Sequence, residues 1–174
     1  MLHRIAAAAA VAVVATVAFA AAQTAALNDA QIAHVAYTAG QIDVAAGKLA
    51  LSKSTNPTVT AFANDMVRDH TAVNDQALAL VKKLNVTPQD NDTSKALTKA
   101  AAEKTTQLSA LSGAAFDAAY IANEVAYHKT VNGALQSTLI PAAQNAELKA
   151  LLSTGLKIFQ GHQAHAEMLA GTIK

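Results

Sequence analysis

Apolar residues between positions 56 and 84 recur at intervals of three and four, the spacing that puts side chains on one face of a helix. The series comprises Val59, Phe62, Met66, Val73, Ala77, Leu80 and Leu84. It is interrupted after Met66, where the chain places Asp69 and His70. Because an acid or an imidazole is costly to bury without a partner, the interruption predicts a polar contact inside the core. The register points His70 inward and leaves Asp69 beside it or in solvent.

A helix is also predicted ahead of this segment, from about residue 29 to residue 54. Asn28 or Asp29 fits its N-cap. Its apolar face comprises Ile32, Val35, Ala39, Ile42, Ala46 and Leu49. Asp43 lies beside this face, at the edge of the predicted core. An asparagine–proline pair separates the two helices, so they are predicted to be antiparallel neighbours.

Two more long helices are predicted in the second half of the chain. The first covers residues 114–139, and its inward positions are Ile121, Glu124, His128, Val131 and Leu135. The second begins after Asn145 and runs to about residue 171, with inward positions Leu148, Leu151, Gly155, Ile158, His162, His165 and Leu169. In both helices, ionisable side chains occupy positions that the periodicity assigns to the core.

A shorter amphipathic segment at residues 95–111 is predicted to be a connecting helix that lies across the bundle, or an extension that leads into the third long helix. One of residues 92–94 fits its N-cap. The composition agrees with helices throughout, because apolar residues make up 52% of the chain while glycine and proline number only 7 and 3. The sequence therefore predicts an all-α protein: an up-down-up-down four-helix bundle with an extra connecting helix.

Residues 1–22 have the features of a secretory signal peptide. Arg4 gives a basic start, a continuous apolar run follows, and alanines at positions 20 and 22 fit a peptidase site. We expect cleavage after Ala22, which leaves residues 23–174 as one mature domain in the periplasm or outside the cell. The alternative is an uncleaved membrane anchor, for which the apolar run is short. After cleavage the chain would have no stable membrane anchor.

The balance of charged residues bears on whether the protein binds nucleic acid. The chain has 13 lysine and arginine residues and 12 aspartate and glutamate residues, so loss of Arg4 with the signal leaves 12 of each. Without clusters of like charge, nucleic-acid binding is not expected.

Cysteine is absent, so stability must come from packing rather than disulfides. No phosphate-binding loop and no nucleophile–base pattern stands out, and enzymatic activity is left open.

The ionisable residues at core positions converge on one level of the predicted bundle. At about 1.5 Å of rise per residue, Asp43 matches His70 across the first turn, and Glu124 matches His162 across the second. The candidate site residues are Asp43, His70, Glu124, His128, His162 and His165. Histidine and carboxylate together suit iron, manganese, zinc or copper. The alternative is a buried hydrogen-bonded network that fixes the helix register without a metal.

Several segments carry a likeness to a known family: AYTAGQIDVAAGKLAL, NPTVTAFANDMVRDHTAVN, LSGAAFDAAYIANEVAYHKTV and FQGHQAHAEML. In this order they resemble domain of unknown function 4142, a family of exported bacterial proteins in the ferritin-like group. The likeness covers about residues 28–170 and implies a periplasmic or secreted helical bundle without an established reaction. The polar positions that the resemblance implies are Asp43, His70, Asp117, His128 and His162. The family usually has glutamate at the first of these and a proline before the last histidine, and it does not fix Glu124 or His165.

Two hypotheses about function follow from the sequence. In the first, an exported ferritin-like bundle binds a transition metal through its central histidine and carboxylate layer and serves envelope metal or oxidative-stress homeostasis. In the second, a non-catalytic envelope protein has a structural or interaction role, and the layer is only a hydrogen-bonded network.

Overall fold

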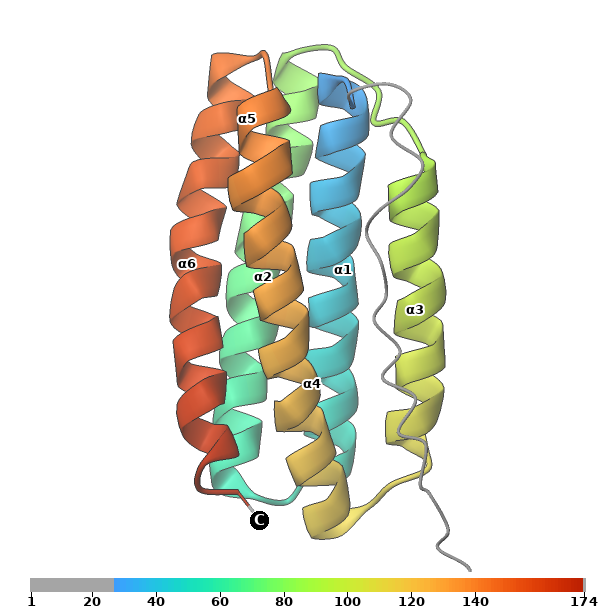
Figure 1. Ribbon diagram of the computed structural model, residues 1–174, viewed down its shortest axis with the longest axis vertical. Helices are drawn as coiled ribbons and strands as arrows, with labels where there is room; N and C mark the ends of the chain where they lie inside the picture. Colours follow the sequence, from blue (N-terminus) through green and yellow to red (C-terminus); the bar gives the residue numbers. More distant parts are fainter. Residues whose placement is uncertain (1–26, 174) are drawn as a thin grey trace, which may run out of the picture.

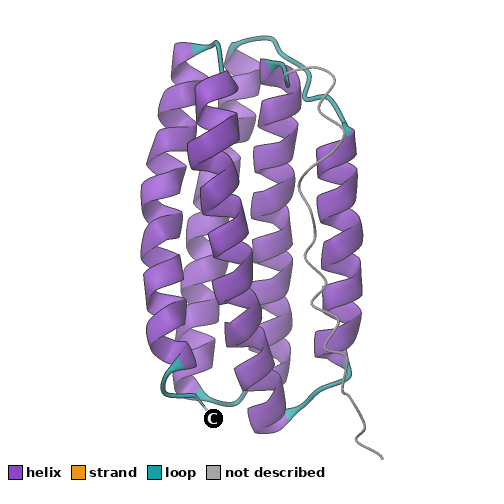
Figure 2. Cartoon of the chain, in the orientation of Figure 1, coloured by secondary structure: helices purple, strands orange, loops and turns teal. Residues whose placement is uncertain are grey.

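The computed structural model describes residues 27–173, and every regular element in that range is helical (Figure 2). The long helices are α1 (Asp29–Lys53), α2 (Pro57–Lys83), α4 (Gly113–Ala134) and α6 (Ala146–Ala170). The other elements are α3 (Asp92–Ser109), a π-helical turn η1 (Leu135–Leu139) and α5 (Ile140–Ala142). The predicted all-α class is confirmed, whereas the predicted signal peptide lies outside the described residues.

Asparagine side chains begin most of these helices. Asn28, Asn56 and Asn145 each accept a hydrogen bond from a backbone N–H of the first turn, as the sequence predicts. Asn91 does the same for α3, where its Oδ1 accepts from the Ser94 amide at 3.1 Å. Helix α3 therefore begins at Asp92, three residues earlier than predicted, because Asn91 is a better-placed cap than the residues that follow it.

The long helices α1, α2, α4 and α6 pack side by side as a helical bundle (Figure 1). The closest partners are α1 with α2 and α4 with α6, so each pair that is joined by a short connection packs together. Helix α3 lies outside these four, mainly against α1. The predicted connecting helix is therefore present, and it runs along the bundle rather than across it.

The predicted up-down-up-down order is wrong, and the reason is the length of α3. Figure 1 shows α1 running down, α2 up, α3 down, α4 up and α6 down. Helix α3 has 18 residues, about 27 Å of helix at the standard rise, and it returns the chain to the end where α2 began. Helices α2 and α4 consequently point the same way, and α1 and α6 point the opposite way.

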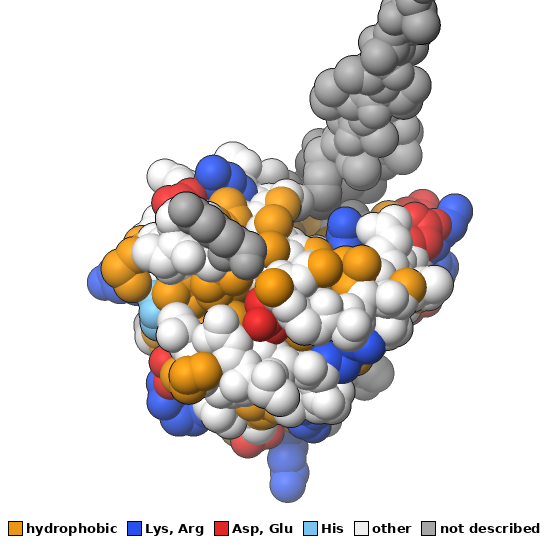
Figure 3. Space-filling model, turned by 90° about the horizontal axis from the view of Figure 1, so that it is seen from below, with side chains coloured by type: hydrophobic (Ala, Val, Ile, Leu, Met, Phe, Trp, Pro, Cys, Tyr) orange, Lys and Arg blue, Asp and Glu red, His pale blue; other side chains and the backbone are white. Residues whose placement is uncertain are grey.

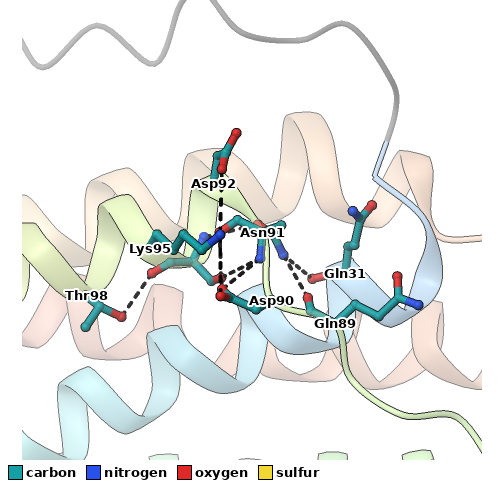
Figure 4. A network of polar contacts seen from close by, with 8 residues as sticks. Gln31, Gln89, Asp90, Asn91, Asp92, Lys95 and Thr98 are labelled. Atoms are coloured by element: carbon teal, nitrogen blue, oxygen red, sulfur yellow. Dashed lines mark hydrogen bonds and ion pairs between the residues drawn. The ribbon is translucent and has the colours of Figure 1, made fainter.

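A polar network fixes the start of α3 against α1 (Figure 4). The Asn91 side-chain amide donates to the backbone carbonyl oxygens of Gln89 at 3.1 Å and Gln31 at 3.3 Å. The Ser94 hydroxyl donates to Asp90 at 2.8 Å, and Lys95 lies 3.6 Å from the same carboxylate. These contacts attach the outer helix at its N-terminal end, far from the middle of the bundle.

Buried apolar side chains form two separate clusters, one toward each end of the bundle. One includes Phe62, Met66, Phe116, Tyr120 and Ala166, and the other includes Ile32, Leu135, Leu148, Leu152 and Phe159. Between them, along the same helices, the buried residues are polar: Asp43, His70, Asn74, Glu124, His128, Asn132 and His162. The candidate site is therefore a polar layer between two apolar layers.

The structure shifts the predicted core face of two helices by one position. On α1, Asp43, Gly47 and Ala50 are buried, whereas Ile42, Ala46 and Leu49 are only half-buried. Asp43 thus lies at the centre of the core face and not at its edge. On α6, Leu152, Phe159 and Ala166 are buried in place of Leu151, Ile158 and His165.

One end of the molecule shows how side chains of different kinds are distributed on its surface. On the end of the molecule seen in Figure 3, basic, acidic and hydrophobic side chains are interspersed. Among the described residues, none of the helices is both long enough and apolar enough to cross a membrane.

Candidate metal centre

Three histidine side chains from three helices meet in the polar layer. His70 lies on α2, His128 on α4 and His162 on α6. Their ring centroids are 5.3 to 5.6 Å apart. Each ring also offers a nitrogen within 4.8 Å of one nitrogen of each of the other two. The structure thus brings these three candidate residues together at one point.

Two carboxylates adjoin the histidines. Oδ2 of Asp43, on α1, lies 3.3 Å from Nε2 of His70 and 3.9 Å from Nε2 of His128. Oε2 of Glu124 lies 3.6 Å from Nδ1 of His128, one turn away on α4. Asp43, Glu124 and His128 form a second group whose potential ligand atoms lie within 4.8 Å of one another. His128 belongs to both groups.

These side chains are buried, yet many of their polar atoms have no hydrogen-bond partner. Asp43 is 2% exposed, and His70, Glu124 and His128 are each 1% exposed. The atoms without a partner include both ring nitrogens of His70, Nε2 of His128, Nδ1 of His162, Oδ1 of Asp43 and Oε2 of Glu124. Leaving a buried polar group unpaired costs about 1–3 kcal/mol. A cation that accepted these lone pairs would remove much of that cost, so the donor set fits a metal ion.

Hydrogen bonds at the outer side of two rings fix which nitrogen carries the proton. Nδ1 of His128 lies 3.0 Å from the backbone carbonyl oxygen of Glu124, which can only accept, so Nδ1–H is the donor. Nε2 of His162 lies 3.0 Å from Oδ2 of Asp69, so in the neutral ring Nε2–H is the donor. The remaining nitrogens, Nε2 of His128 and Nδ1 of His162, then hold free lone pairs.

Burial shifts the protonation of the layer toward neutral groups. It lowers the pKa of His70 to about 2 and that of His128 to about 4. It also raises the pKa of Glu124 to about 7, and burial together with the nearby Glu124 charge raises the pKa of Asp43 well above its usual value. Near neutral pH the imidazoles are therefore uncharged, which is the form that binds metals.

The surroundings hold the rings in place. The ring of Phe159 stacks on His70 with centroids 4.4 Å apart and planes within 5° of parallel. Tyr127 donates its hydroxyl proton to the backbone oxygen of Ala39 at 3.0 Å, which ties α4 to α1 beside the layer. These contacts leave the histidine ring nitrogens of the layer little freedom to turn away from one another.

Not every candidate from the sequence reaches the layer. His165 belongs to neither group, and its half-buried ring packs edge-on against Phe62 at 5.2 Å. Asp117 is buried but is also outside both groups. Glu124, by contrast, lies inside the layer, although the family resemblance did not imply it.

Two polar residues of the layer and one polar contact beside it escaped sequence analysis. Asn74 and Asn132 are buried one turn beyond His70 and His128, and their i,i+4 spacing to a core histidine is a signal that could have found them. Asp69 flanks His70 and is partly exposed, as expected, and it also contacts His162, which was not expected. No periodic pattern marks that contact, because it depends on where α6 lies.

Comparison with known proteins gives one match. The model of a family described as "Domain of unknown function (DUF4142)" matches residues 14–169. No curated protein matches the chain, and no solved structure does.

Proposed function

Because the chain belongs to the family described as domain of unknown function (DUF4142), whose description states no activity, we propose a function from the buried cluster itself. The protein binds a first-row transition metal ion at the centre of its bundle. His70, His128 and His162 supply nitrogen ligands, and Asp43 supplies a carboxylate oxygen beside two of them. Each of the four long helices would then contribute one ligand.

The observation that carries this proposal is the set of buried ring nitrogens without partners: both nitrogens of His70, Nε2 of His128 and Nδ1 of His162. The alternative, a purely structural network, would use these atoms as hydrogen-bond donors or acceptors. Converging lone pairs on neutral rings are instead what a metal ion requires. Imidazole nitrogen with carboxylate oxygen suits iron, manganese, zinc or copper.

His128 limits the proposed site to one ion. Its Nδ1–H is committed to the backbone oxygen of Glu124, so a neutral His128 has a single lone pair, at Nε2. The histidine group and the carboxylate group both need that lone pair. The proposal is therefore one ion per chain, with Glu124 beside it.

The cellular context is part of the same proposal. The signal-like pattern of residues 1–22 supports export, so the domain of residues 23–174 would work in the periplasm or outside the cell. Long helices that carry inward-facing histidine and carboxylate groups support a ferritin-like four-helix arrangement. Envelope metal homeostasis or protection against oxidative stress is the role that such a protein would serve.

The test is metal binding by protein that was purified without a metal-affinity tag and stripped with chelator. Calorimetry and elemental analysis with iron, manganese, zinc and copper should find about one ion per chain for at least one metal. That metal should stabilise the fold by about 2.7 kcal/mol at a free concentration 100 times its Kd.

The matched variants are His128→Ala and His165→Ala. Both remove an imidazole from the bundle, but only His128 belongs to the proposed site. The first should lose binding and the second should keep it. A wild-type protein that binds none of the four ions, or equal binding by the two variants, would contradict the proposal and favour a structural role for the layer.

A further inference from the structure

His162 connects the buried layer to the outside of the protein. Its side chain is 10% exposed, and its Nε2 lies 3.0 Å from Oδ2 of Asp69, whose side chain is 27% exposed. Asp69 directly precedes His70 on α2. Helix α2 thus carries one histidine of the cluster and also the carboxylate that contacts another histidine, on α6.

Arg68 holds the Asp69 carboxylate from its other side. Nε of Arg68 donates to Oδ1 of Asp69 at 2.7 Å, and Nη2 donates to Oδ2 at 3.0 Å. The same guanidinium also donates through Nη1 to Asp65 at 2.7 Å. These two parallel hydrogen bonds from a guanidinium keep the carboxylate in one orientation and pair it with a positive charge.

We infer that Asp69 is a positioning residue of the metal centre: its carboxylate takes the hydrogen bond from Nε2–H of His162 and so directs the Nδ1 lone pair at the ion. The inference rests on the proposed function. A neutral imidazole has one N–H, and an ionised carboxylate can only accept. The proton of His162 therefore sits on Nε2, and Nδ1, which is buried and without a partner, is left to bind.

A carboxylate behind a ligating histidine fixes the ring and strengthens the nitrogen as a donor to the metal. His128 has a comparable arrangement, with the backbone oxygen of Glu124 in the outer position. His70 has no such partner on either nitrogen, and the stacked ring of Phe159 orients it instead. Among the three histidines, His162 is the one oriented by an ionised side chain.

A merely structural role is the competing explanation, in which the Asp69–His162 contact only ties α2 to α6. A doubly protonated, charged His162 would tie the two helices together equally well. A protonated ring would place Nδ1–H in a buried position where no acceptor contacts it. The two explanations differ in the proton on Nδ1 and in whether loss of Asp69 changes metal affinity.

The experiment compares Asp69→Ala with Asp65→Ala, which loses a contact of the same arginine but touches no histidine. Zn²⁺ affinity is measured by chelator competition, and the tautomer of His162 is read by NMR of ¹⁵N-histidine-labelled, metal-free protein. Asp69→Ala should bind Zn²⁺ about 10- to 100-fold more weakly than the wild type, and Asp65→Ala should bind within about twofold of it. The wild type should show His162 neutral and protonated at Nε2.

The readouts separate this inference from the proposed function. If the wild type binds Zn²⁺ and Asp69→Ala binds it equally well, the inference is overturned while the metal site stands. A wild-type His162 protonated at Nδ1 also overturns it, whether or not an ion binds. Absence of binding by the wild type for every metal removes the proposed function and this inference with it. Should Asp69→Ala fail to fold, Asp69→Asn keeps the shape but weakens the acceptor, and it should still lower the affinity.

Discussion

The Asp43 carboxylate faces the His70 imidazole across the interface of α1 and α2, with Oδ2 and Nε2 only 3.3 Å apart. The geometry does not make a hydrogen bond, and Nε2 of His70 has no other partner. Each group is buried among groups that disfavour its charged form. The contact therefore adds little to the stability of the metal-free protein.

Asp43→Asn should separate binding from folding. The amide keeps the shape of the side chain but is a poor metal ligand, so the affinity for the bound ion should fall about tenfold or more, a change in binding free energy of at least about 1.4 kcal/mol. The metal-free variant should unfold at a denaturant concentration at least as high as that for the metal-free wild type, because it has no buried carboxylate that must be neutralised. Chelator competition and urea unfolding measure the two effects.

The matched control is Asp117→Asn, since Asp117 is also buried on a core helix but lies outside both groups. This variant should leave the metal affinity unchanged. If both substitutions weaken binding equally, the loss does not arise from coordination by Asp43.

The stability of the metal-free protein should depend on pH through opposing contributions. The pKa of His70 falls to about 2 in the folded protein, so acidification below pH 6.5 protonates the unfolded chain first and destabilises the fold by about 1.4 kcal/mol per pH unit. The pKa of Glu124 rises to about 7, so the folded protein takes up this proton first and gains stability as the pH falls from about 7 to 4.5. The two effects offset each other between about pH 6.5 and 4.5, where the lowered pKa of His128 adds to the contribution of His70.

Glu124→Gln removes the offset and should make the protein more sensitive to acid. As the pH falls from 7 to 5, the unfolding free energy of the variant should decrease more steeply than that of the wild type, by about 1.4 kcal/mol per pH unit. At pH 8 the variant should be more stable than the wild type, because the cost of ionising a buried Glu124 is gone. Urea unfolding at several pH values in excess chelator provides the measurement, and parallel pH profiles for the two proteins would contradict the assigned shift.

Gly47 permits the close approach of α1 and α2. A Cβ at this position would lie 2.8 Å from Cγ2 of Val67 and 3.1 Å from the backbone oxygen of Ala63. Since backbone cannot move aside cheaply, Gly47→Ala should destabilise the protein by about 1–3 kcal/mol. At Gly133 on α4 a Cβ meets nothing within 4 Å, so Gly133→Ala should stabilise by up to about 1 kcal/mol. Thermal unfolding should show a melting temperature below that of the wild type for Gly47→Ala and above it for Gly133→Ala.

Helix existence and helix starts were predictable because they depend on local chemistry. Asparagine caps at positions 28, 56 and 145 stand where the periodic segments begin, and the structure uses all three. The order of helix directions was not predictable in the same way. It depends on whether α3 lies across the bundle or along it, and that is decided by contacts with α1, which is distant in sequence from α3.

The position of Asp43 shows why the core face was misplaced on α1. After Ala39 the next inward residue could be Ile42 or Asp43, and both spacings fit a helix. A hydrophobicity rule selects Ile42, but the structure buries Asp43 because a polar layer crosses the bundle at that height. Sequence rules based on hydrophobicity fail where the core contains a layer of polar side chains. The contact of Asp69 with His162 was missed for a related reason, since His162 lies on a helix distant in sequence.

Helix α3 and the loops beside it connect the two halves of the proposed metal centre. The hairpin of α1 and α2 carries Asp43 and His70, and the pair α4 and α6 carries His128 and His162. This covalent connection makes the meeting of the two halves an intramolecular event. A cut between α3 and α4 would make assembly of the centre depend on protein concentration. An ion bound by both halves would then act as a non-covalent cross-link that holds the severed chain together.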